Sequence, residues 1–179
     1  MKAVVIYESI FGNTRKIAEA IGKGLGERYE VSLFEVGQAD YKVLDGVDLL
    51  VVGGPTHIGS LSRPASRQAA VEEMKKMALD CQPVSGKIGL REWLSLLPDT
   101  KSGSAAAFDT RMPKKGFIPV SIASRRMASK LKKHGYRLAG KPEGFVVTET
   151  SGPLRDGELE RAVQWGRALA VAIDGYHLY

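Results

Sequence analysis

Hydroxyl, amide and glycine residues gather directly after the first apolar run of the chain. Lys2 to Tyr7 predicts a buried strand, a helical pattern begins at about Asn13, and the turn reads Ser9-Ile10-Phe11-Gly12-Asn13-Thr14. Unpaired N–H groups at a helix start carry partial positive charge and suit a phosphate. Ser9 and Thr14 would add donors, and Gly12 can adopt the positive φ that brings the backbone close to an anion. This turn is therefore a candidate phosphate site, with an ordinary N-capped helix start as the alternative.

Two commoner phosphate motifs are excluded. A Walker A loop needs a lysine before its Ser or Thr, and here Asn13 occupies that position. A dinucleotide fingerprint needs three glycines directly after the strand. Gly22, Gly24 and Gly26 lie instead at the far end of the first helix, where we interpret them as a loosened helix end.

The elements that must position this turn alternate between strands and helices. Continuous apolar runs predict strands, and apolar residues at helical spacing predict helices that pack one face on a sheet. The expected strands are 2–7, 31–36, 49–52, 104–108 and 145–148, with a short segment at 136–139 beside the last; the expected helices are 13–28, 64–79, 89–97, 120–134 and 156–174. This order predicts a parallel sheet with helices on both faces, because parallel neighbours need helical crossovers. We expect one domain over residues 1–179.

Composition narrows the class of protein. The chain has 179 residues, of which 44% are hydrophobic and 26% charged. No apolar run approaches the roughly 18 residues that cross a bilayer, and the N-terminal run is too short for a signal peptide. Cys81 is the only cysteine, so no intramolecular disulfide can form and we expect a cytoplasmic location. His57, His134 and His177 lie far apart without ligand partners at metal spacing, so no metal site is expected.

One segment makes the protein basic. The formal net charge is +6, and the stretch from Arg111 to Lys141 holds ten Lys or Arg residues and no Asp or Glu. The stretch is either a solvated helix face or a patch for an anionic partner. The only aromatic residues within it are Phe117 and Tyr136, which disfavours nucleic-acid binding.

The sequence resembles the flavodoxin family over nearly its whole length. The turn from Tyr7 to Thr14 looks like the family's phosphate loop, with hydroxyl residues around a glycine. Further similarity to small bacterial and archaeal members is carried by Gly53-Gly54-Pro55-Thr56-His57, Gly89-Leu90-Arg91-Glu92-Trp93-Leu94, Phe108-Asp109-Thr110-Arg111 and Gly152-Pro153-Leu154-Arg155-Asp156-Gly157-Glu158-Leu159. The resemblance implies a three-layer αβα fold with a five-stranded parallel sheet of order 2-1-3-4-5. It also implies FMN at the carboxyl ends of the strands.

The resemblance implies two more binding loops beside the phosphate turn. The loop after the third strand would lie against the isoalloxazine ring, and the loop after the fourth strand would approach the opposite ring face and the pyrimidine edge. The expected cofactor-binding residues in these loops are Pro55, Thr56, His57, Ile58, Gly59, Phe108, Asp109, Thr110, Arg111 and Gly116.

The expected ring site departs from that of electron-transfer flavodoxins, which usually hold the ring between aromatic side chains. Here the first ring loop offers His57 and Ile58, and the nearest residues in the other loop are Phe117 and Met112. The Pro55-Thr56 start also resembles flavodoxin-fold quinone reductases. Three functions follow as alternatives: an FMN electron carrier served by a redox partner protein, an NAD(P)H:quinone-type reductase, and a binding module that has lost FMN. No residue is expected to be catalytic by acid–base chemistry.

Overall fold

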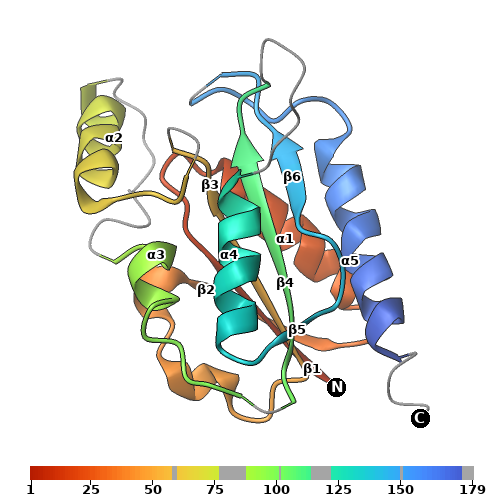
Figure 1. The fold of residues 1–179 in the computed structure, drawn as a ribbon. Helices are drawn as coiled ribbons and strands as arrows, with labels where there is room; N and C mark the ends of the chain where they lie inside the picture. Colours follow the sequence, from red (N-terminus) through yellow and green to blue (C-terminus); the bar gives the residue numbers. More distant parts are fainter. Residues whose placement is uncertain (58–59, 77–87, 101, 114–121, 150, 175–179) are drawn as a thin grey trace.

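The computed structural model describes the chain except for residues 58–59, 77–87, 101, 114–121, 150 and 175–179. Its described strands form one parallel sheet (Figure 1). The strand order is β2-β1-β3-β4-β5, with β6 also paired to β4, which confirms the predicted order 2-1-3-4-5. The strands are β1 (Lys2–Tyr7), β2 (Glu30–Glu35), β3 (Leu49–Pro55), β4 (Ser104–Arg111), β5 (Arg137–Leu138) and β6 (Glu143–Val146).

Two short strands share the fifth position of the sheet. β5 pairs with the start of β4, at Ser104 and Ala105, and β6 pairs with its end, from Phe108 to Arg111. Pro142 lies between them and has no N–H to donate, so the ladder is interrupted there. The residues predicted as the segment 136–139 therefore pair with the start of β4. They do not pair with β6, the last strand.

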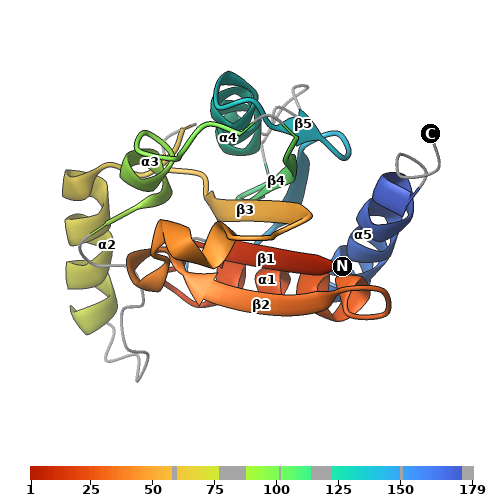
Figure 2. The same ribbon diagram turned by 90° about the horizontal axis from the view of Figure 1, so that it is seen from below.

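Apart from α2, which stands at one end of the sheet, the helices form a layer on each face (Figure 2). On one face α1 packs against α5, and on the other face lie α3 and α4. Two 3-10 turns follow β2, at Val36–Gln38 and Tyr41–Leu44. The helices are α1 (Asn13–Leu25), α2 (Pro64–Lys76), α3 (Leu90–Trp93), α4 (Ile122–Lys133) and α5 (Glu158–Asp174).

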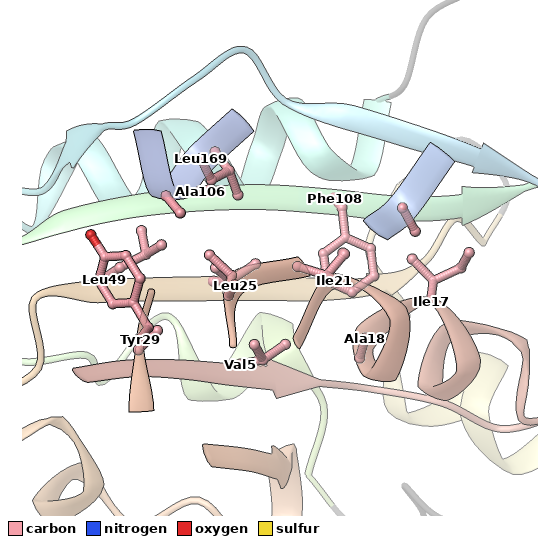
Figure 3. Close-up of a cluster of buried hydrophobic side chains, with 14 of the residues drawn as sticks. Val5, Ile17, Ala18, Ile21, Leu25, Tyr29, Leu49, Ala106, Phe108 and Leu169 are labelled. Carbon is pink, nitrogen blue, oxygen red and sulfur yellow. The ribbon is translucent and has the colours of Figure 1, made fainter. Parts of the chain in front are cut away.

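Each face of the sheet has its own hydrophobic core. Between the sheet and α1 and α5, side chains such as Val5, Ile21 and Phe108 are fully buried (Figure 3). The opposite core joins Ile6, Val52 and other strand residues to α3 and α4. Strands buried on both faces explain why β1 and β3 are continuous apolar runs in the sequence.

The glycines at the end of α1 make a close helix crossing. A Cβ on Gly24 would collide with the carbonyl oxygen of Val163 in α5, and one on Gly166 would collide with that of Ile21. Gly22 and Gly24 are buried inside the helix, which continues to Leu25. The loosened helix end expected from these glycines is therefore wrong, because their missing side chains let α1 and α5 touch.

The central strands end at one edge of the sheet. Tyr7 pairs with Gly53, and Gly53 pairs with Phe108, so the residues that follow each strand emerge side by side. β3 and β4 run three residues further than predicted, to Pro55 and Arg111. The turn after β1 and the loop after β3 therefore meet the end of β4 at the carboxyl edge.

Candidate functional site

The turn between β1 and α1 forms the first wall of a cavity at this edge. Gly12 is the N-cap residue of α1, with a φ of 87° and no side chain of its own to bond to the helix. A Cβ on Gly12 would have nothing within 4 Å, so the turn needs glycine for its backbone angle and not for space. Asn13 and Thr14 begin the helix, are buried and line the cavity. An anion is favoured at this positive end of α1.

Hydroxyl and amide contacts join this turn to its neighbours. Thr14 Oγ1 and Thr110 Oγ1, both on buried residues, lie 2.7 Å apart. Only one of the two hydroxyls donates this bond, so the other still has a proton to offer a ligand. Ser9 Oγ accepts a 3.3 Å bond from the Arg15 N–H, and Asn13 Nδ2 donates to the Gly152 carbonyl at 2.6 Å. The second bond ties the turn to the segment before α5.

The cavity has a volume of about 330 Å³. Small-molecule sites in proteins typically have volumes of roughly 300–1,000 Å³, so this cavity can hold at least part of a cofactor. Ten of the sequence-predicted residues line it: Ser9, Ile10, Phe11, Asn13 and Thr14 from the turn, Pro55, Thr56 and His57 after β3, and Thr110 and Arg111 at the end of β4.

Two residues that line the cavity after β3 each have a buried side-chain polar atom without a partner in the described part of the chain. Thr56 Oγ1 and His57 Nε2 have no hydrogen-bond partner among the described residues. Their backbone is fixed, because the Thr56 N–H donates to the Thr110 carbonyl at 2.9 Å and His57 exchanges two backbone bonds with Ser60. An unpaired buried polar atom costs about 1–3 kcal/mol.

The His57 imidazole is adapted to neutral hydrogen bonding. Burial lowers the pKa of His57, and the charge of Arg67 in α2 lowers it further. A neutral imidazole nitrogen donates or accepts according to its tautomer. His57 can therefore pair with either a donor or an acceptor atom.

Two predicted residues lie behind the cavity and do not line it. Phe108 is fully buried in the core beneath β3, where a Cβ on Gly53 would collide with its ring. Asp109 is also fully buried, and its Oδ2 accepts the Ser124 N–H at the start of α4 at 2.9 Å. In the run Phe108-Asp109-Thr110, Phe108 therefore packs in the core and Asp109 holds the start of α4. Of the three residues, only Thr110 lines the cavity.

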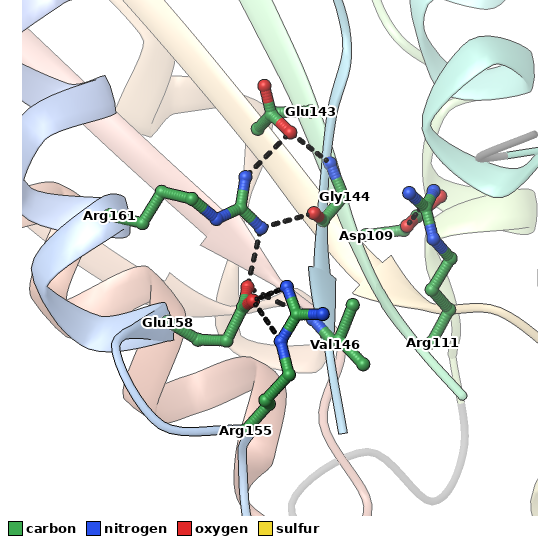
Figure 4. A network of polar contacts seen from close by, with 8 residues as sticks. All are labelled: Asp109, Arg111, Glu143, Gly144, Val146, Arg155, Glu158 and Arg161. Atoms are coloured by element: carbon green, nitrogen blue, oxygen red, sulfur yellow. Dashed lines mark hydrogen bonds and ion pairs between the residues drawn. The ribbon is translucent and has the colours of Figure 1, made fainter. Parts of the chain in front are cut away.

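Arg111 lines the cavity but directs its charge elsewhere. Its guanidinium extends back along the sheet to Asp109, with Nη1 3.5 Å from Oδ1 (Figure 4). A Cβ on Gly144 would collide with this guanidinium, so the arginine covers a glycine of β6. The positive charge of Arg111 therefore lies over β6 at the edge of the sheet.

Ile58, Gly59 and Gly116 lie outside the described residues, as do Phe117 and Cys81. The cavity contains two residues absent from the predicted set, Met112 and Val147. Met112 directly follows β4, and the sequence suggested it only as a substitute for Phe117. Val147 follows β6, and its place in an apolar strand run gave no signal of a binding role.

A charged network fixes the strand that precedes Val147 (Figure 4). Glu158 is 2% exposed, and its carboxylate accepts bonds from the Val146 N–H at 3.1 Å and from Arg155 Nη2 at 2.6 Å. Arg161 also bonds to Glu158 and to Glu143. Burial alone would raise the pKa of Glu158, but the bonds from Arg161, Arg155 and Val146 outweigh it and hold the pKa below its usual value. The network holds β6 and α5 together beside the cavity.

The described residues show neither a metal cluster nor a membrane span. In that part of the chain no three His, Cys, Asp or Glu residues gather as metal ligands. No helix there is long and apolar enough to cross a membrane.

Comparison with known proteins places the chain among doubly wound α/β proteins. A sequence model described as flavodoxin matches residues 5–144, while no curated protein gives a match. A flavodoxin from the domain Archaea superposes with a TM-score of 0.65 and 20% identity over 97% of this chain and 99% of that chain. Oxidised flavodoxin 2 from Bacillus cereus gives a TM-score of 0.66 at 18% identity, over 96% and 99%. The Flv1 flavodiiron core from Synechocystis sp. PCC6803 gives 0.65 at 17% identity, over 98% of this chain but 36% of that one.

Strand order and a cavity at the carboxyl edge define the class: a doubly wound α/β sheet with a cavity beyond its strand ends, where such sheets bind ligands. Within this class the chain belongs to the flavodoxin family, because the family match covers most of its length. Family and fold together support a flavin-binding electron-transfer protein.

Proposed function

We propose that this protein binds FMN in the cavity at the carboxyl edge and transfers electrons through it. The observation that carries the proposal is the pairing of two features in one cavity. One wall is a helix start suited to a phosphate, and another has two buried polar atoms that lack partners. FMN has a phosphate at one end and a polar ring at the other, so it matches both.

The phosphate would bind at the start of α1. Backbone amides from Gly12 to Thr14 and the hydroxyls of Ser9 and Thr14 supply donors without a charged side chain. Because Thr14 and Thr110 share one hydroxyl bond, a phosphate that accepts from one of them leaves that bond intact.

The ring would lie between the β3 loop and the end of β4. Thr56 Oγ1 and His57 Nε2 would pair with ring oxygen or nitrogen atoms, and Ile10, Met112 and Val147 would supply apolar contact. FMN would provide the redox chemistry, while the protein provides orientation and electrostatics.

The test is a titration of the purified protein with FMN. We expect quenching of flavin fluorescence at micromolar protein and retention of the flavin's visible bands after gel filtration. Unchanged fluorescence and colourless protein would contradict the proposal and favour a module that has lost FMN.

A second assay separates the carrier from the reductase. The Pro55-Thr56 start of the ring loop favours testing quinone reduction, because this start resembles quinone reductases. NAD(P)H oxidation by the FMN-loaded protein with a quinone acceptor would identify a reductase. Activity only through a protein electron donor would identify a carrier.

The basic segment is proposed as the contact for an anionic redox partner. Arg125, Arg126, Lys132 and Lys133 are exposed along α4, and no acidic residue lies on that helix. A one-sign surface of this kind attracts opposite charge and speeds encounter.

A further inference from the structure

A single arginine holds the end of the loop that follows β3. Arg91 of α3 donates from Nε to the Ser62 carbonyl at 2.9 Å. Its Nη2 donates to the Leu61 carbonyl at 2.7 Å and to Ser60 Oγ at 3.1 Å. One rigid, planar group thereby fixes three consecutive residues, which a lysine ammonium on a flexible stem cannot reproduce.

A second arginine reaches the same loop from α2. Arg67 is fully buried, and its Nη1 donates to Ser62 Oγ at 3.0 Å. Its Nη2 lies 3.0 Å from Glu92 Oε2 of α3, so the buried charge has a partner. Its charge also lowers the pKa of His57. Arg67 therefore acts on both ends of the loop.

A buried carboxylate connects these contacts to β1. Glu8 is 1% exposed, and its Oε2 accepts the Leu90 N–H at 2.8 Å. A Cβ on Gly89 would collide with the Arg67 guanidinium and lie 2.9 Å from Glu8 Oε2, so glycine lets the chain pass between the two side chains. The cluster thus joins α2 and α3 to the strand that precedes the phosphate turn.

The cluster reaches the cavity through the backbone. The N–H of His57 donates to the Ser60 carbonyl at 2.8 Å, and the N–H of Ser60 donates back to His57 at 2.9 Å. Since Arg91 holds Ser60, the position of the His57 ring depends on Arg91 through one residue pair. A buried ion pair rarely adds more stability than apolar residues of the same volume, so stability alone gives little reason for charges here.

We propose that Arg91 and Arg67 are positioning residues for the ring half of the FMN site. They hold residues 60–62, and Ser60 is bonded in turn to the backbone of His57, which lines the cavity. The inference rests on the proposed function. Ring binding should therefore depend on these arginines, and phosphate binding should not.

The test compares FMN with riboflavin, which has the same ring and lacks the phosphate. Arg91→Met and Arg91→Lys are titrated with both flavins by fluorescence, and Arg67→Met serves as an independent variant. We expect Arg91→Met to lower both affinities by the same factor, about tenfold, because an unheld loop must be ordered on binding. Arg91→Lys should fall between Arg91→Met and wild type. Arg167→Met, in an exposed ion pair with Glu27 on another face, is the matched control and should match wild type.

The ratio of FMN to riboflavin affinity separates the outcomes. An unchanged ratio with both affinities reduced, in variants with native far-UV circular dichroism, supports positioning of the ring loop. Wild-type affinity for riboflavin in folded Arg91→Met overturns the inference and leaves FMN binding intact. Failure of the wild type to bind either flavin instead overturns the proposed function.

Discussion

Thr14 is the residue at which a phosphate role can be tested most cleanly, because its hydroxyl lies at the helix start and beside Thr110. Its pairing with Thr110 could not be foreseen, since 96 residues separate the two. The turn itself could be, because hydroxyl residues around a glycine between a strand and a helix form a local pattern. The family resemblance assigned Phe108 and Asp109 to a loop at the cavity, yet both lie inside β4, which runs to Arg111, and both are fully buried.

The first prediction concerns the phosphate end of the site. Ser9→Ala combined with Thr14→Ala should weaken FMN binding by about 2–4 kcal/mol, through the loss of two hydrogen bonds to a charged group. Riboflavin affinity should stay the same. Fluorescence titration measures both, with Ser32→Ala combined with Ser129→Ala, two exposed serines, as the control. Unaltered FMN affinity would place the phosphate elsewhere.

The second prediction follows from the lowered pKa of His57. In the unfolded chain His57 takes up a proton at its ordinary pKa of about 6.5. In the folded protein its lowered pKa opposes this protonation. The unfolding free energy should therefore fall as pH drops below the ordinary value and level off below the folded pKa. Urea unfolding of wild type and His57→Gln between pH 7.5 and 5 isolates the contribution. A wild-type advantage that grows toward acid would contradict the lowered pKa.

At the scale of elements, the sequence predicts the central strands and the long helices, but not how some of them pack and pair. Continuous apolar runs predicted β1 and β3, and helical spacing predicted α1 and α5. The crossing of α1 and α5 was missed, because glycines inside a helix give the same sequence signal as a frayed end. The split into β5 and β6 depends on Pro142 and on pairing with β4, and strand periodicity does not encode that pairing.

The helix crossing gives the third prediction. Gly24→Ala and Gly166→Ala should each lower the free energy of unfolding by about 1–3 kcal/mol, because the added methyl must push α1 and α5 apart. Gly26→Ala is the control, since Gly26 is exposed with a φ of −62°. Urea denaturation measures all three. A Gly24→Ala variant as stable as Gly26→Ala would mean that the helices do not meet as described.

At the scale of the whole molecule, positive charge gathers along one helix, α4. The chain has a net charge of +6, and exposed cations follow α4 from its pocket-side start to its far end. The sequence predicted this segment, since a run without acidic residues needs no tertiary information. It did not predict that the Arg111 guanidinium would fold back over Asp109.

The fourth prediction is a salt dependence of electron transfer. Oxidation of the reduced, FMN-loaded protein by anionic ferricyanide should slow by about tenfold between low and high salt, since screening removes steering. Arg125→Glu combined with Arg126→Glu should lower the low-salt rate. A neutral quinone acceptor is the control and should respond little to salt. Equal salt dependence for both acceptors would exclude steering by this helix.

The central claim is that FMN binds at the carboxyl edge with its phosphate at the start of α1. Amide shifts in ¹H–¹⁵N spectra, recorded as FMN is added, test the claim most directly. We predict the largest shifts at Gly12, Asn13 and Thr14 and at Thr56 and His57, with inorganic phosphate moving only the first group. Shifts confined to other parts of the chain, or none at millimolar FMN, would contradict it.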